Sequence, residues 1–212
     1  MATSTYSHSW KQELANAITH GIGFLLSIPA MVMLIMFAAQ KNSPLYMASF
    51  LVFGISMLLL YLFSTLLHSF YWTKIKTFLA ILDHSAIFLL IAGTYTPIVL
   101  ITLHGTLGWI LFSIVWSMAV IGIAGKCFLI HRFKLLSTIL YLMMGWFVII
   151  AIKPLYTGLS ATGFWLLLTG GICYSVGAVF YTWKNLPYSH AVWHLFVIAG
   201  SAFMYFCILF YV

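Results

Sequence analysis

The chain is divided into seven apolar stretches, each about as long as a helix that crosses a membrane. A membrane-spanning helix needs about 20 mainly apolar residues. Hydrophobic residues make up 64% of the 212 residues and charged residues 5%, which is too few charges to cover the surface of a water-soluble domain. The sequence therefore predicts an all-α membrane protein, a seven-transmembrane helix bundle that forms one domain over residues 1–212. The predicted spans are residues 20–39, 45–68, 79–101, 106–126, 135–153, 162–183 and 190–212.

The basic residues indicate the orientation of this bundle. Seven of the nine Lys and Arg residues lie before the first span or in the second, fourth and sixth loops, whereas Lys41 and Lys153 lie on the other side. Loops rich in Lys and Arg stay in the cytoplasm. We therefore expect a multi-pass protein of the cell membrane with its N-terminus in the cytoplasm and its C-terminus outside. Because the basic residues are scattered between apolar stretches, the net charge of +7 does not indicate a nucleic-acid partner, and membrane lipids are the expected partners.

Five polar side chains lie in the predicted spans at positions that suit a metal site. Ser64 and His68 are four residues apart near the end of the second span, so they share one face of a helix. Asp83 lies in the first turns of the third span. His190 and His194, again four residues apart, begin the seventh span. The predicted topology brings all five to one depth near the cytoplasmic side.

The chemistry of these five residues favours zinc. The His190 and His194 pair can hold one ion, and His68 completes a three-histidine site whose fourth position is left to water, which is the pattern of catalytic zinc. Nitrogen and oxygen ligands without a thiolate make Zn²⁺ the first choice, although other divalent ions also fit. Asp83 is expected to hold that water and accept its proton, and Ser64 to donate a hydrogen bond to a substrate carbonyl or to Asp83. The alternative is that the histidines are interfacial residues whose tips reach the lipid headgroups.

Three further polar residues precede the apolar part of the first span. Glu13, Asn16 and His20 follow one another at spacings of three and four residues and lie on the cytoplasmic side. One interpretation is that they cap and anchor the first span. The other is that they form an outer layer around the metal ligands, or a gate on the cytoplasmic opening of the site.

Several stretches of the sequence, in this order, resemble those of one known family. They are Glu13–Gly23, Ser64–His68, Asp83–Ile87 with Gly93–Pro97, and His190–His194. Together they resemble the haemolysin III family, the bacterial branch of the progestin and adipoQ receptors. The resemblance covers nearly the whole chain.

The resemblance implies a seven-helix bundle in the bacterial inner membrane, with a cytoplasmic N-terminus and an intramembrane zinc near that face. It implies that His68, His190 and His194 are the zinc ligands, that Asp83 reaches zinc through water, and that Ser64 lies close by. The family is also similar to alkaline ceramidases, which are membrane hydrolases.

Three functions compete at this point. The first is zinc-dependent hydrolysis of a lipid amide or ester. The second is a receptor or membrane-state sensor in which zinc is structural and nothing is turned over. The third, a pore-forming cytolysin, is less favoured because a pore needs a continuous polar lining and the polar residues here gather at one end. A retinal protein is excluded because residues 185–212 contain no lysine for a Schiff base. The lipid substrate and the oligomeric state stay open.

Overall fold

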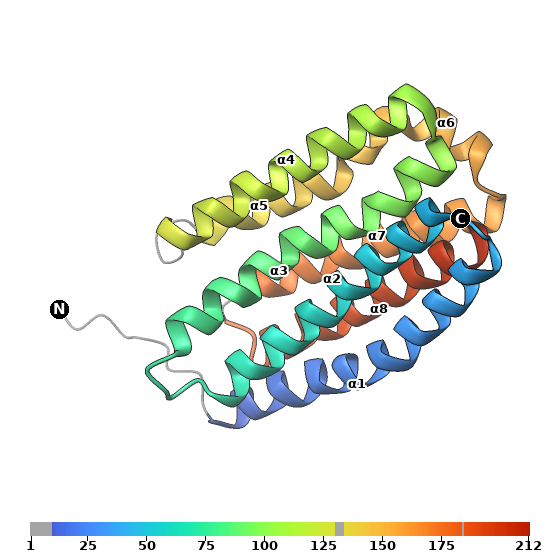
Figure 1. Ribbon diagram of the computed structural model, residues 1–212. Helices are drawn as coiled ribbons and strands as arrows, with labels where there is room; N and C mark the ends of the chain where they lie inside the picture. Colours follow the sequence, from blue (N-terminus) through green and yellow to red (C-terminus); the bar gives the residue numbers. More distant parts are fainter. Residues whose placement is uncertain (1–9, 130–133, 184) are drawn as a thin grey trace.

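The protein is a bundle of long, roughly parallel and antiparallel helices (Figure 1). The computed structural model describes residues 10–129, 134–183 and 185–212. Within these residues there is no strand, and seven helical segments are long and apolar enough to cross a membrane. The predicted seven-transmembrane bundle is confirmed. The helices are α1 (Trp10–Gln40), α2 (Pro44–Ser69), α3 (Lys76–Pro97), η1 (Ile98–Leu103), α4 (Gly105–Leu129), α5 (Lys134–Trp146), η2 (Phe147–Ala151), α6 (Ile152–Gly158), α7 (Ala161–Thr182) and α8 (Ser189–Tyr211).

The largest difference from the predicted boundaries is at the start of the first span. Helix α1 begins at Trp10, whereas the prediction began at residue 20, where the apolar stretch starts. The added turns carry Glu13, Asn16 and His20, and these side chains are only 5%, 1% and 3% exposed. Because α1 packs against α2 and α8, it buries these polar side chains in the bundle. Hydropathy alone could not extend the helix through them.

Two of the seven spans are made of more than one helical segment. Helix α3 ends at Pro97 and continues as the π-helical turn η1, and α5 passes through the 3₁₀ segment η2 into α6. The Tyr95 hydroxyl supports the change of helix type in the fifth span. It lies 3.0 and 2.9 Å from the carbonyl oxygens of Met144 and Gly145 and accepts the Val148 N–H at 2.6 Å. A side chain of α3 thus satisfies backbone groups that the end of α5 leaves open.

Helices α2, α3 and α8 are the most buried of the spans, whereas α4 and α5 are more exposed and lie on the side of the bundle away from α1 (Figure 1). The fully buried side chains include Phe50, Phe53 and Ile208. Helices α2 and α3 approach closely at Gly93, where a Cβ atom would lie 2.2 Å from the Ser56 Oγ. Glycine is needed there because any larger residue would push the two helices apart.

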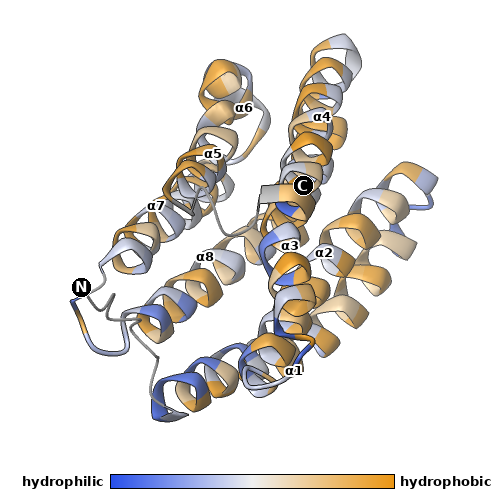
Figure 2. Cartoon of the chain, turned by 90° about the vertical axis from the view of Figure 1, so that its left-hand side faces the viewer, coloured by the Kyte–Doolittle hydropathy of each residue, from blue (hydrophilic) through white to orange (hydrophobic). Residues whose placement is uncertain are grey.

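One end of the bundle gathers polar residues. It is the end at which α1, α3 and α8 begin, and Lys74, Lys76 and Lys126 lie there too. We call it the basic end. Figure 2 shows hydrophilic segments at the beginnings of α1 and α8. Because α1 begins at the basic end and α8 ends at the other, the chain crosses the bundle an odd number of times. That the basic end faces the cytoplasm stays a prediction from the charge distribution.

Candidate metal centre

Three histidines meet at the basic end of the bundle. His68 comes from the last turn of α2, and His190 and His194 come from the first turns of α8. Each offers one ring nitrogen, and these three atoms lie within 4.8 Å of one another. His68 is 8% exposed and His194 is 1% exposed. The spacing of four residues in α8 and the common depth of α2 and α8 thus bring together the three residues predicted as ligands.

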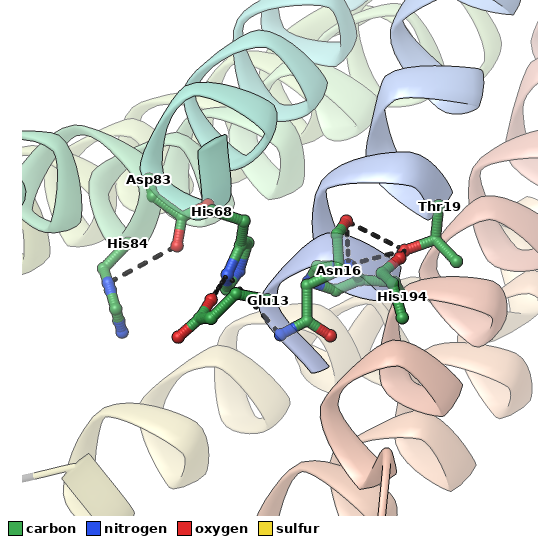
Figure 3. Close-up of polar contacts among 8 residues, drawn as sticks. Glu13, Asn16, Thr19, His68, Asp83, His84 and His194 are labelled. Atoms are coloured by element: carbon green, nitrogen blue, oxygen red, sulfur yellow. Dashed lines mark hydrogen bonds and ion pairs between the residues drawn. The ribbon is translucent and has the colours of Figure 1, made fainter. Parts of the chain in front are cut away.

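The His68 ring is held from α1. Its Nδ1 lies 2.6 Å from the Glu13 Oε2 (Figure 3). Because a carboxylate accepts and does not donate, the short contact places a proton on Nδ1. The other nitrogen, Nε2, is left to bind a metal, and it is buried with no hydrogen-bond partner among the described residues. A buried acceptor without a partner is rare, and a metal ion would satisfy it.

The His194 ring is held from α1 as well. Its Nδ1 lies 3.2 Å from the Asn16 carbonyl oxygen and 3.0 Å from the Thr19 Oγ1 (Figure 3). A carbonyl oxygen can only accept, so Nδ1 carries the proton here too and Nε2 is left to bind a metal. Two of the three histidines thus have the arrangement typical of metal ligands, in which the nitrogen away from the metal donates to an oxygen.

Helix α1 also packs an aromatic ring on the centre. The His20 ring stacks on His194 with a centroid separation of 3.5 Å and an interplanar angle of 13°, and it meets the Tyr61 ring edge-on at 5.1 Å. Neither His20 ring nitrogen has a hydrogen-bond partner within the part of the chain that the structure describes. Thr19, in contact with His194, was missed by the sequence analysis. A threonine in a helix does not by itself indicate a functional site, because its hydroxyl commonly donates to a carbonyl oxygen of the preceding turn. The Thr19 hydroxyl does so here as well.

Asp83 and Ser64 lie beside the three histidines but outside their group. Both line a cavity of about 170 Å³ whose wall also includes His20, His190 and His194. The Asp83 Oδ2 lies 3.6 Å from the His84 Nδ1, which is beyond hydrogen-bonding distance, and the Ser64 hydroxyl makes no hydrogen bond to another residue of the described chain. Asp83 and Ser64 therefore present polar groups to the cavity at the point where the histidines meet.

The cavity is long and mostly apolar. Its wall follows the third span from Asp83 of α3 to Ile98 of η1, and α8 from His190 to Met204, which corresponds to roughly 20 Å at 1.5 Å rise per residue. Apolar side chains from α2, α3, α7 and α8 form most of this length. They include Leu60, Leu90, Leu167 and Val197.

The cavity wall includes side chains of η2 and α6 that are also exposed. Ile149 and Ile152 line it and are also 51% and 44% exposed on the outside. In a bilayer that surface faces acyl chains, so the cavity and the lipid meet there.

Seven membrane-crossing helices with a buried three-histidine cluster at one end define the class of this chain, a multi-pass membrane protein with a candidate metal centre. Its sequence matches the family described as haemolysin-III related over residues 8–205. The chain belongs to this family, as its sequence stretches predicted.

The relatives extend this result. The chain is 62% identical over 201 residues to a hemolysin-3 homolog of Bacillus subtilis (strain 168), covering 95% of this chain and 94% of that one. It is 58% identical over 202 residues to hemolysin-3 of Bacillus cereus, covering 95% and 92%. It is also 27% identical over 214 residues to the human monocyte to macrophage differentiation factor, covering 98% and 87%. The family of the chain and its multi-pass membrane location are thus established.

Proposed function

We propose that His68, His190 and His194 bind Zn²⁺ and that the protein uses it to hydrolyse an amide or ester bond of a membrane lipid. The observation that carries this proposal is the buried His68 Nε2, which has no hydrogen-bond partner among the described residues. The His68 ring lies 5.0 and 5.2 Å from the rings of His190 and His194, which line the apolar cavity. Three neutral imidazoles suit zinc and leave its fourth position open. Zinc, when bound, would polarise a carbonyl and make water a stronger acid.

The residues around the histidines support a division of roles. Asp83 can accept the proton of the attacking water and later pass it to the leaving group, because its side chain is not engaged in a hydrogen bond with His84. Ser64 has a hydroxyl without a partner in the described chain and can donate to the carbonyl of the substrate. Both groups line the cavity at its metal end.

The cavity supports a lipid as the substrate. An acyl chain laid along its apolar length brings the carbonyl group to Asp83, Ser64 and the histidines. The exposed lining residues Ile149 and Ile152 provide a side on which a chain can enter directly from the bilayer. Such a pocket, apolar with a few convergent polar groups, is typical of a small-molecule site.

The outer layer formed by α1 fits the same proposal. Glu13, Asn16 and Thr19 hold the Nδ1 atoms of two ligand histidines, and His20 stacks on one of them. Partners of this kind fix the tautomer and orientation of a ligand and raise its basicity. We therefore assign Glu13, Asn16 and His20 to the support of the metal site.

Replacing Glu13 with glutamine should weaken zinc binding about 10- to 100-fold, the usual effect of losing a charged outer partner. Glutamine has nearly the same shape and can still accept from His68, but it lacks the charge that strengthens the 2.6 Å contact. Competition of the purified protein with a zinc chelator measures the affinity. Asp83→Asn, which removes the other carboxylate of the chain, is the matched control and should bind zinc as the wild type does. Equal affinity for Glu13→Gln and the wild type would contradict the role of Glu13.

A second function, a sensor with a structural zinc, is favoured by one observation. The histidines join α2 to α8, and α1 contacts two of them, so an ion at this place ties three helices together. This candidate differs from the first in a measurable way, since it requires a bound ion and no turnover. Pore formation has less support, because the cavity wall is apolar over most of its length.

The decisive experiment combines metal analysis with lipid analysis. Purified protein is stripped with a chelator, reloaded with zinc and placed in nanodiscs of total bacterial lipid. We expect about one zinc per chain and release of free fatty acid, detected by mass spectrometry, only from the reloaded sample. Full zinc occupancy with no product from ester- or amide-linked lipids would exclude the hydrolase and favour the sensor.

A further inference from the structure

Tyr181, near the end of α7, belongs to the metal end of the cavity but has no part in the mechanism described above. Its ring centroid lies 5.6 Å from that of the ligand His190 and 5.7 Å from that of Trp193. It lines the cavity together with Asp83 and Ser64, and the Asp83 carboxylate is close enough to act on it electrostatically. Its hydroxyl makes no hydrogen bond to any residue of the described chain.

The other tyrosines of the cavity wall behave differently. The Tyr95 hydroxyl bonds to backbone groups at the end of α5, the Tyr141 hydroxyl donates to the His84 carbonyl oxygen at 2.9 Å, and the Tyr174 hydroxyl lies 2.9 Å from the Ser201 Oγ. A phenol in an apolar interior normally has such a partner. Tyr181 is the exception, and it is the one whose ring contacts a ligand histidine.

We infer that Tyr181 is a further catalytic residue, which donates its O–H to the carbonyl oxygen of the lipid amide or ester. This inference rests on the proposed hydrolysis. In the first step the water oxygen bonds to the carbonyl carbon, a water proton passes to Asp83, and the electron pair of the C=O bond moves onto oxygen. In the second step that pair re-forms the C=O bond, the bond to nitrogen or oxygen breaks, and the leaving group takes the proton from Asp83. Tyr181 keeps its proton and stabilises the negative oxygen between the two steps.

Two donors from different helices would then share the developing charge. Ser64 comes from α2 and Tyr181 from α7, and neither hydroxyl is engaged elsewhere in the described chain. A donor that is fixed in place before the reaction and has no competing partner needs no rearrangement as the charge forms. The contacts of the Tyr181 ring with His190 and Trp193 provide that fixed position.

The test is Tyr181→Phe, which removes one oxygen and keeps both ring contacts. We expect kcat for hydrolysis of p-nitrophenyl palmitate in detergent micelles to fall about 100-fold, with zinc content and thermal midpoint unchanged. The affinity of the zinc-loaded protein for palmitate, measured without turnover, should fall about tenfold because the carboxylate loses a donor. The control is Tyr205→Phe, which removes a hydroxyl of α8 that lies outside the cavity and bonds to the Ala30 carbonyl oxygen at 3.3 Å. It should match the wild type in activity per zinc.

The outcomes separate this inference from the function on which it rests. If the wild type hydrolyses the ester and Tyr181→Phe does so with the same kcat and the same palmitate affinity, the role of Tyr181 is overturned and the hydrolase stands. If the zinc-loaded wild type hydrolyses neither the ester nor any bacterial lipid, the hydrolase is overturned and the catalytic role of Tyr181 with it. A selective loss of kcat in Tyr181→Phe, absent from Tyr205→Phe, supports both.

Discussion

Replacing His194 with alanine should remove the metal from the protein and destabilise the bundle at the same time. The His194 ring is 1% exposed, stacks on His20 at 3.5 Å and lies 3.2 Å from the Asn16 carbonyl oxygen. Alanine therefore removes one of three ligands, leaves a cavity and breaks a contact between α1 and α8. Truncation of a large, fully buried side chain costs about 3–5 kcal/mol. Elemental analysis of the purified protein and its thermal midpoint with and without added zinc measure the two effects.

The matched control for this variant is a histidine at the other end of the bundle. His104 lies between η1 and α4, is exposed, and has a positive φ of 39°. Its ψ is −174°, and glycine adopts this combination freely, so His104→Gly removes an imidazole without adding strain. It should keep the zinc content and the thermal midpoint of the wild type. If His194→Ala retained about one zinc per chain, the three-histidine site would be wrong.

The sequence was sufficient to predict the helices and the grouping of the ligands. Length and hydropathy define a membrane span directly, because lipid permits few other structures. His190 and His194 are four residues apart, and His68 lies at the same predicted depth. This was enough to group the three histidines, although His68 precedes His190 by 122 positions. What failed was the start of α1, since a helix that buries Glu13 and Asn16 looks polar until its partners are known.

The cavity and Tyr181 could not be predicted for a related reason. They depend on which helix packs beside which. In lipid, the hydropathy of an apolar helix does not show which of its faces contacts another helix. Tyr181 is one of 12 tyrosines in the chain, and its contact with His190 and its hydroxyl without a partner in the described chain distinguish it from the other tyrosines of the cavity wall. The depth of a residue in the membrane is thus readable from the sequence, whereas its direction around the helix bundle is not.

The two acidic residues of the chain, Glu13 on α1 and Asp83 on α3, have different surroundings. Glu13 is bonded to His68 at 2.6 Å and 5% exposed, so its charge is used to hold a ligand. Asp83 lines the cavity, and the neighbouring His84 Nδ1, 3.6 Å from its Oδ2, is hydrogen-bonded to the Ala80 carbonyl oxygen at 2.7 Å. The Asp83 carboxylate therefore makes no short hydrogen bond to His84 and can still accept one from a substrate or from water. A carboxylate in a membrane interior is costly enough that each should have a specific role. We therefore expect substitution of Glu13 to affect zinc binding and substitution of Asp83 to affect hydrolysis.

Replacing Asp83 with asparagine should abolish lipid hydrolysis while leaving the metal and the fold in place. Asparagine matches aspartate in size but cannot accept the proton of the attacking water, and loss of a general base costs about 10²–10⁴-fold in rate. Zinc binding should persist because the three ligand nitrogens, within 4.8 Å of one another, come from other residues. The measurements are zinc content, thermal midpoint and fatty-acid release in nanodiscs of bacterial lipid.

The comparison with Glu13→Gln makes this prediction specific. In Glu13→Gln, hydrolysis should fall with zinc occupancy and return when zinc is supplied in excess, because the defect is in affinity. In Asp83→Asn, no amount of zinc should restore hydrolysis, because the defect is in proton transfer. Rescue of Asp83→Asn by excess zinc would show instead that Asp83 acts on metal binding, and the assignment of the base would have to be given up.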